Sequence, residues 1–230
     1  MQFRRSHVHF AKVSAIFISH LHGDHCFGLL GLLSTFGMLG RTSRLKVFAP
    51  ECYASLFEQQ MNFFMQGMTY EIEFVPVDTT QQKVVYEDHS VTVETVPLRH
   101  RVPCCGYIFR EKPTLPHIRR DMIDYYGIPL SQINNIKNGA DWTTPEGDIV
   151  PNSRLVEPAD APRSYAYCSD TCYLPDLYER VKDVTVLYHE STYTSENEDR
   201  AKIYYHSTAR QAALVAQKAG AGRLLLGHYS

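Results

Sequence analysis

The hexapeptide HLHGDH at residues 20–25 constrains this chain more than any other segment, because it places three imidazoles and one carboxylate close together. It directly follows VSAIFIS, a β-branched run typical of a strand that is buried on both faces. Imidazole nitrogens and carboxylate oxygens suit zinc, and four such groups exceed what one ion can bind while keeping an open position. The segment therefore predicts a site for two metal ions, with Asp24 and His25 facing the second ion.

Other polar residues lie at or just past the ends of predicted strands. His100 follows the run VTVETVP, Asp170 follows SYAYCS, Glu190 follows VTVLY and His228 follows LLL. Taken singly, His100 is as readily a surface histidine between two arginines, and Asp170 a helix N-cap. Because strand ends of an open α/β sheet meet at one edge, these residues together are expected to converge with HLHGDH.

Predicted strands alternate with predicted helices, which favours an α/β sandwich. Helices are expected at 26–39, where Gly40 follows the last apolar residue, at 51–66 and at 208–219. Each has the apolar content of a helix that packs on a sheet. The pattern predicts a layered core whose sheets are covered by these helices.

The segment at 111–162 differs from the rest of the chain. Prolines and glycines become frequent there, and apolar residues lose their regular spacing. A short helix is expected near 118–126. We therefore expect one domain over 1–230, interrupted by an inserted arm at 111–162 that buries little apolar surface.

Composition bounds the class of protein. Of 230 residues, 44% are apolar, which is enough for a core, and the formal net charge of -2 is not that of a dedicated nucleic-acid clamp. A local basic patch could still steer RNA. The six cysteines form no CxxC pair and are expected to be reduced. Because no stretch has the apolar content of a signal peptide or a membrane span, we expect a soluble, cytoplasmic protein.

Six segments of the chain resemble the ribonuclease Z family of the metallo-β-lactamase superfamily. The pattern HxHxDH is the signature of the superfamily, and HLHGDHCFGLLGLL is similar to its ribonuclease Z version. The other five segments are RHRVPCCGYIF, YCSDT, HEST, HSTARQAA and GHYS. The resemblance covers essentially the whole chain and implies a four-layer αβ/βα sandwich, with a flexible arm at 111–162 that grips tRNA.

The resemblance also implies an activity, a cofactor and an assembly. The activity is that of a zinc-dependent endoribonuclease that cleaves the 3′ trailer from precursor tRNA by two-metal phosphodiester hydrolysis. The cofactor is two Zn²⁺ ions per subunit, with Mn²⁺ or another divalent ion as the alternative, and the assembly is a homodimer. The implied metal ligands form one set for each ion and one shared residue: His20, His22 and His100; Asp24, His25 and His228; and Asp170 between the two.

Three residues have implied catalytic roles. Asp24 would orient or deprotonate the attacking water while it binds the second ion. His206 would donate a proton to the leaving 3′ oxygen of the RNA, and Glu190 would hold its imidazole in a carboxylate–imidazole pair. In this scheme His206 is not a metal ligand.

Members of the family begin before the point where this chain starts and continue past GHYS. The resemblance therefore implies a chain trimmed at both ends, and it leaves the activity of this exact chain open. Two alternatives remain. The first is another hydrolase of the same fold, such as a cyclic-nucleotide phosphodiesterase or an arylsulfatase, against which the arm and the HEST and HSTA segments argue. The second is a non-catalytic tRNA-binding fragment, against which the full ligand set argues.

Overall fold

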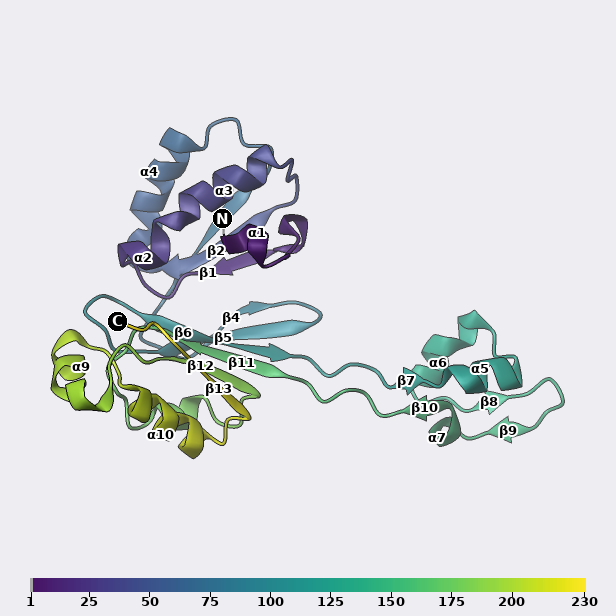
Figure 1. Cartoon of the computed structure of the whole chain (residues 1–230). Helices are drawn as coiled ribbons and strands as arrows, with labels where there is room; N and C mark the ends of the chain where they lie inside the picture. Colours follow the sequence, from purple (N-terminus) through teal and green to yellow (C-terminus); the bar gives the residue numbers. More distant parts are fainter. Residues whose placement is uncertain (1) are drawn as a thin grey trace. The chain divides into compact units, whose positions relative to one another are not determined.

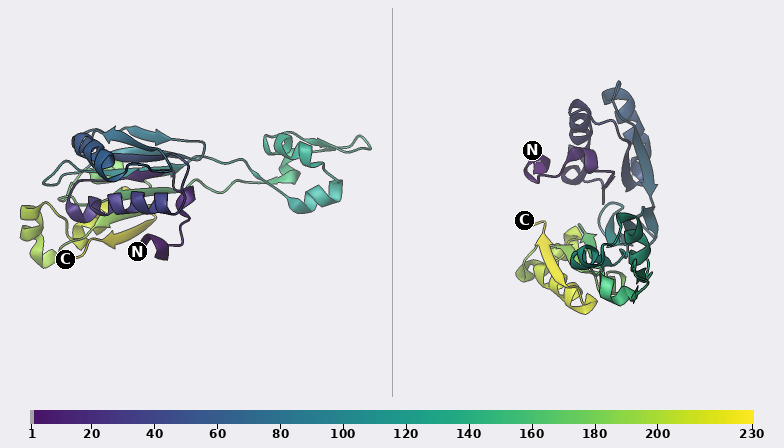
Figure 2. Two further views of the ribbon diagram at one scale, coloured as in Figure 1. Left: turned by 90° about the horizontal axis from the view of Figure 1, so that it is seen from above. Right: turned by 90° about the vertical axis from the view of Figure 1, so that its right-hand side faces the viewer.

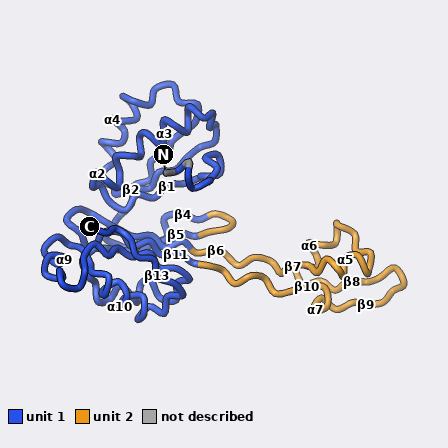
Figure 3. Tube along the Cα trace, in the orientation of Figure 1, with its two compact units in different colours: residues 1–87, 92–109, 164–230 blue, residues 88–91, 110–163 orange. Residues whose placement is uncertain are grey.

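The computed structural model describes residues 2–230, which form two compact units (Figure 3). Unit 1 comprises residues up to 87 together with 92–109 and 164–230, and unit 2 comprises residues 88–91 and 110–163. Every residue predicted for the metal site belongs to unit 1. The chain therefore leaves unit 1 and returns to it between the first and the last of those residues.

The first sheet of unit 1 has three parallel strands in the order β1-β2-β3. They span Ala15–Phe17 (β1), Leu45–Pro50 (β2) and Ile72–Val77 (β3). Parallel neighbours need a crossover connection, which the helices α3 (Gly28–Met38) and α4 (Ala54–Phe64) provide. Helices and sheet share one apolar core, whose fully buried members include Leu33, Phe36, Leu45 and Val47.

The buried Arg41 side chain ties the beginning of the chain to the end of α3. Two short helices open the described chain, α1 (Gln2–Arg5) and the 3-10 helix η1 (Phe10–Lys12). The Arg41 guanidinium lies 5.7 and 5.3 Å from the ring centroids of Phe36 and Tyr70. It donates hydrogen bonds of 2.7 to 2.9 Å to the carbonyl oxygens of Phe10, Val13, Ser43 and Arg44.

The second sheet of unit 1 has six strands in the order β13-β12-β11-β6-β5-β4. β11, β12 and β13 run parallel to their neighbours in this group, whereas β4 and β5 form an antiparallel pair. The bounds of the six strands are Val84–Glu87 (β4), Val91–Pro97 (β5), Cys105–Glu111 (β6), Ser164–Cys168 (β11), Val186–Glu190 (β12) and Arg223–Gly227 (β13).

Helices α8 (Leu177–Arg180) and α10 (Ala209–Ala219) pack on this second sheet. α10 begins with a capping box in which the Thr208 side chain accepts from the Gln211 amide and Gln211 bonds back to Thr208. It ends at Gly220, which adopts φ 66°. The 3-10 helix η4 (Ser195–Asn197) and α9 (Glu198–Tyr204) precede α10.

Aromatic side chains join the two sheets of unit 1. The ring of Phe17 in β1 lies 5.2 Å from the rings of Tyr107 and Phe109 in β6, measured between centroids. The Tyr107 hydroxyl donates a 2.8 Å hydrogen bond to the carbonyl of Ile18. Unit 1 is therefore layered as helices, sheet, sheet and helices, as two views show (Figures 1 and 2). The predicted four-layer sandwich is confirmed.

Unit 2 has a small apolar core of its own. Its helices are α5 (Arg120–Tyr126), α6 (Ile133–Lys137) and α7 (Asn152–Leu155), with the 3-10 helix η3 at Leu130–Gln132. Two short antiparallel pairs complete it: β7 (His117–Ile118) with β10 (Val156–Glu157), and β8 (Trp142–Thr143) with β9 (Ile149–Val150). The buried members of its core are Ile128, Ile136, Val150 and Leu155.

The strands and helices that the sequence predicts in unit 1 lie close to where the structure has them, but the sequence did not predict the strands β3 and β4 or the helices α8 and α9. The strand β3 contains Pro76, and a proline argues against a strand in the interior of a sheet, but β3 is an edge strand. The strand β4 is short and lies at the edge of the second sheet. Among residues 2–230, no helix has both the length and the apolar content needed to cross a membrane.

Candidate metal centre

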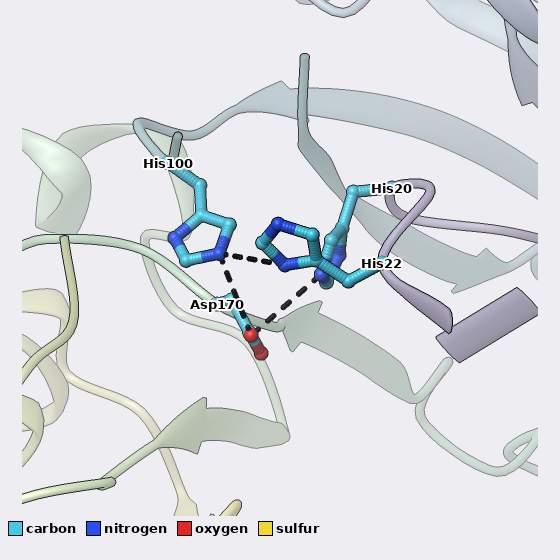
Figure 4. A group of neighbouring side chains, drawn as sticks. All are labelled: His20, His22, His100 and Asp170. Carbon is cyan, nitrogen blue, oxygen red and sulfur yellow. Dashed lines mark hydrogen bonds and ion pairs between the residues drawn. The ribbon is translucent and has the colours of Figure 1, made fainter. Parts of the chain in front are cut away.

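The predicted ligands converge because each follows a strand of unit 1. Figure 4 shows four of them, His20, His22, His100 and Asp170. His20 and His22 lie in the loop after β1, and Asp24 and His25 lie in the short helix α2 (Gly23–Cys26) that follows it. The remaining three follow strands of the second sheet: His100 after β5, Asp170 after β11 and His228 after β13. Segments that are far apart in sequence thus supply one cluster.

Gly23 allows the turn between the two pairs of ligands for a steric reason. It begins α2, and a Cβ atom at this position would collide with the ring of Phe27. Gly23 is not among the glycines with positive φ, so conformational freedom is not what the turn requires. The small residue lets the Phe27 ring cover the turn while Asp24 and His25 face the cluster.

One carboxylate oxygen, Oδ2 of Asp170, lies at the middle of the cluster. Its distances to the Nε2 atoms of four histidines are 3.6 Å for His20, 3.5 Å for His25, 3.7 Å for His100 and 3.4 Å for His228. These distances are long for hydrogen bonds between charged groups, which are nearer 2.7–2.9 Å. The spacing is instead that of donor atoms around shared cations.

The donor atoms fall into the two sets that the resemblance implied. Those of His20, His22, His100 and Asp170 lie within 4.8 Å of one another, and so do those of Asp24, His25 and His228. Asp170 and His228 form a third such set with His206. Asp24 lies 3.3 Å from His25 and 3.9 Å from His228, although its side chain is 70% exposed.

Burial and charge favour the protonation states that bind cations at His20, His100 and Asp170. Burial, followed by repulsion from His25, lowers the pKa of His20 to about 3. Burial also lowers the pKa of His100. For Asp170, burial favours the neutral acid, but the neighbouring His25, His228 and His20 outweigh it and hold its pKa well below the usual range. The Asp170 carboxylate raises the pKa of His25 in turn.

Two imidazole nitrogens of the cluster test whether a metal ion fits. Nε2 of His20 and Nε2 of His25 are buried, and neither has a hydrogen-bond partner in the described part of the chain. Buried polar atoms are normally satisfied by a partner. Both nitrogens face the same Asp170 oxygen, so cations held between these groups would satisfy them. The donor set therefore fits a metal.

Three of the candidate ligand histidines contact an oxygen atom from outside the cluster through Nδ1, the ring nitrogen that does not face Asp170. Nδ1 of His20 lies 3.0 Å from the Ser19 hydroxyl, and Nδ1 of His228 lies 2.8 Å from the Thr192 hydroxyl. Nδ1 of His100 lies 2.9 Å from the carbonyl oxygen of Tyr205. Such contacts fix the orientation of a ligand histidine and leave Nε2 for the metal.

His206 and Glu190 form a buried pair beside the cluster. Nδ1 of His206 donates a 2.8 Å hydrogen bond to Oε1 of Glu190, which is fully buried. Glu190 also accepts from the backbone amides of Thr171 and Thr192 and from the Thr192 hydroxyl. Burial favours the neutral acid, but these hydrogen bonds outweigh it and lower the pKa of Glu190. The carboxylate therefore fixes the orientation of the His206 imidazole, with Nδ1 as the donor.

The sequence patterns did not point to Ser19, Thr192 and Tyr205, which contact three of the candidate ligand histidines. Thr192 belongs to the HEST segment, so its position beside Glu190 was a signal that could have found it. Ser19 directly precedes His20. Tyr205 has no comparable signal, because it acts through a backbone carbonyl that every residue has.

Comparisons with known proteins agree with this geometry. Residues 1–118 match the family model described as a beta-lactamase superfamily domain. The protein called ribonuclease Z from Bacteroides fragilis (strain YCH46) is 50% identical over 230 residues, which cover 100% of this chain and 76% of that protein. Ribonuclease Z from Phocaeicola vulgatus is 51% identical over 230 residues, covering 100% of this chain and 74% of that protein.

Solved structures share the fold at low sequence identity. The crystal structure of human tRNase Z, short form, is similar with a TM-score of 0.67 and 21% identity, covering 100% of this chain and 77% of that chain. A long form RNase Z from yeast has a TM-score of 0.66 and 16% identity, covering 96% of this chain and 29% of that chain. At these identities the likeness establishes the arrangement of the layers and no more.

Proposed function

We infer that this chain, which belongs to the ribonuclease Z family of the beta-lactamase superfamily, is an endoribonuclease that removes the 3′ trailer from precursor tRNA. The observation that carries this inference is 50% identity to a ribonuclease Z over the whole of the chain. The cluster around Asp170 supports it, because phosphodiester hydrolysis by enzymes of this superfamily needs a divalent metal and the donor set fits one.

Zinc is the ion that we propose for this cluster. His20, His22 and His100 would hold one ion, Asp24, His25 and His228 the other, and Asp170 would bind both. When bound, zinc supplies Lewis acidity at the phosphoryl oxygens and lowers the pKa of water. Imidazole and carboxylate donors without thiolate support zinc, and they also admit Mn²⁺.

The chain's own side chains would move the protons of the reaction. Asp24, whose carboxylate is largely exposed, would orient the attacking water and accept its proton. His206 would donate a proton to the leaving 3′ oxygen. Glu190 supports this role because its carboxylate binds Nδ1 of His206, which leaves Nε2 of a protonated His206 free to act as the donor.

The segment 111–162 is proposed to bind the tRNA. It forms almost all of unit 2, whose own apolar core supports a compact fold for this segment. The basic residues Arg120 and Lys137 lie in or beside its short helices and have no ion pair within 4.0 Å in the described part of the chain. Cations of this kind contact phosphates of the RNA backbone.

A homodimer in the cytoplasm is the proposed assembly and location. Five large apolar side chains on or beside α3 and α4 are more than half exposed: Phe27, Met38, Leu56, Phe63 and Phe64. Exposed apolar groups of this size support a contact with a second copy. The free cysteines support a reducing compartment.

The proposed function is tested with a precursor tRNA that carries a 3′ trailer. The metal-loaded protein is expected to cut it once, at the base of the trailer, and a chelator should abolish the cut. A cyclic nucleotide and an aryl sulfate serve as competing substrates. Binding of the precursor without cleavage, or faster turnover of either competing substrate, would contradict the proposal.

A further inference from the structure

A cavity of 480 Å³ opens beside His206 in unit 1. Its walls come from the same segments that position the candidate metal centre. Arg99 directly precedes His100, Cys172 and Tyr173 follow Asp170, and Tyr205 directly precedes His206. His206 lines the cavity itself. A molecule held there would touch the group that is proposed to donate the proton.

Two cations of the cavity are available to a ligand. Arg99 and Lys202 both line it, and neither forms an ion pair within 4.0 Å with any described residue. The Arg99 guanidinium carbon lies 5.7 Å from the centroid of the Tyr205 ring, so it is placed by a cation–π contact. Cations placed in this way without an acidic partner suit an anionic group such as a phosphate.

The same cavity offers flat rings and hydrogen-bond acceptors. Tyr173 and Tyr205 supply rings, and Glu198 and Asp199 supply carboxylates. Gln211 is less available, because it bonds to the Thr208 amide and to Glu198. Rings stack on nucleobases, and carboxylates accept from their exocyclic amino groups. Phosphate, ring and amino group are the three parts of one nucleotide.

We propose that this cavity holds one unpaired nucleotide of the RNA, namely the nucleotide whose 3′ oxygen leaves. The inference rests on the proposed function, because it takes His206 as the donor of the proton to that oxygen. A volume of 480 Å³ lies within the range of about 300–1,000 Å³ that is usual for small-ligand sites. The base would stack beside Tyr205, and the 5′ phosphate would meet Arg99 and Lys202.

The test uses a thiol that is already in the cavity. Cys172 lines the cavity and is half-buried, whereas Cys52 is exposed and does not line it. N-ethylmaleimide labels the metal-loaded protein, and mass spectrometry follows each cysteine. Adenosine 5′-monophosphate is expected to slow labelling of Cys172 several-fold and leave that of Cys52 unchanged. Inorganic phosphate, which lacks the base, is expected to slow neither.

Three variants and a control locate the binding. Arg99→Gln, Lys202→Gln and Tyr205→Leu should each raise the nucleotide concentration for half-protection by about 5-fold or more. Lys202 is an exposed residue of α9, so its substitution should not disturb the fold. The control is Arg223→Gln, an exposed residue at the first position of β13 and therefore at the strand end opposite His228. In this variant, the nucleotide concentration that half-protects Cys172 should equal that of the wild type.

Two results would overturn the inference. One is equal labelling of Cys172 with and without nucleotide, and the other is protection by inorganic phosphate as strong as that by the nucleotide. The proposed function fails separately, if the same preparation does not cleave precursor tRNA. Cleavage of precursor tRNA without protection of Cys172 by the nucleotide would therefore exclude the proposed role of the cavity, while the proposed function would stand.

Discussion

The carbonyl oxygen of Tyr205 lies 2.9 Å from Nδ1 of His100, and Tyr205 itself has a left-handed backbone with φ 58°. A non-glycine residue in this region is strained, so surrounding contacts must hold it there. This contact links the candidate metal cluster to the His206–Glu190 pair, because the residue after Tyr205 is His206. One turn of the backbone thus orients a candidate metal ligand and positions the proposed proton donor.

Replacing Tyr205 by proline should weaken metal binding. Proline fixes φ near −65°, so the carbonyl would turn away from His100 and leave its Nδ1 unpaired. Loss of such a contact typically lowers metal affinity by about 10–100-fold. Tyr205→Gly is the matched variant, because glycine adopts φ 58° freely and keeps the carbonyl. Chelator competition should separate the two variants, and equal affinities would contradict the role of the carbonyl.

Asp170→Asn should remove metal from both sets of ligands, because one oxygen of Asp170 faces histidines of both. An amide has no negative charge to offset two cations. We expect bound metal, measured by mass spectrometry of the digested protein, to fall below one ion per chain. Asp176→Asn is the control, since Asp176 forms only a surface ion pair with Arg180. Retention of two ions in Asp170→Asn would exclude Asp170 as the shared ligand.

His206→Ala should lower the turnover of precursor tRNA by about 10²–10⁴-fold, the usual loss for a general acid. Its metal content should stay at the wild-type level, because Nδ1 of His206 binds Glu190. The third set of donor atoms, Asp170, His206 and His228, makes this measurement decisive. If metal is lost together with turnover, His206 is a metal ligand, and its proposed role as the donor of a proton to the leaving oxygen is wrong.

Arg120→Gln combined with Lys137→Gln should weaken binding of precursor tRNA and make it less sensitive to salt. Each lost phosphate contact lowers the slope of log affinity against log salt by about 1. The control within unit 2 is Arg163→Gln, because Glu111 already neutralises Arg163 through a bidentate pair. A salt series of binding isotherms gives the slopes. Identical slopes for wild type and double variant would remove the tRNA role of these residues.

Arg41→Met should lower the free energy of unfolding by about 3 kcal/mol, because it removes the charged donor of a buried side chain from four backbone carbonyl groups. Urea titration measures the change. Arg44→Gln is the control, since Arg44 is largely exposed and solvent screens its pairs with Glu71 and Glu73, so its replacement should change the free energy of unfolding much less. Similar losses for both variants would show that the buried hydrogen bonds of Arg41 are not what stabilises this region.

The candidate ligands that the structure brings together could be predicted from the sequence because of where they stand in it. HLHGDH is a dense motif, and His100, Asp170 and His228 each follow a run of strand-forming residues. The contact of Tyr205 with His100 could not be predicted in this way, because it depends on a backbone carbonyl brought close by the fold. Sequence patterns depend on side-chain types, whereas the Tyr205 side chain takes no part in this contact.

Unit 2 shows a different limit of prediction. The irregular apolar spacing of 111–162 predicted an arm that buries little apolar surface, yet Ile128, Ile136, Val150 and Leu155 are buried there. Each comes from a different short element or loop. One buried residue per element gives no period to detect, so a small core of this kind is visible only once the elements are assembled.

The layered arrangement of unit 1 has a consequence for the order of folding. Each sheet has its own apolar core, one around Leu33 and Phe36 and the other around Ile108 and Leu187, so each half can collapse by itself. The two metal sets that the resemblance implies each take two residues from the first half, His20 and His22 or Asp24 and His25, and the rest from the second. Contacts between such distant segments form late. An ion that binds only when the two halves are together would stabilise their association. The rate at which the ion is lost would then report how often the halves separate.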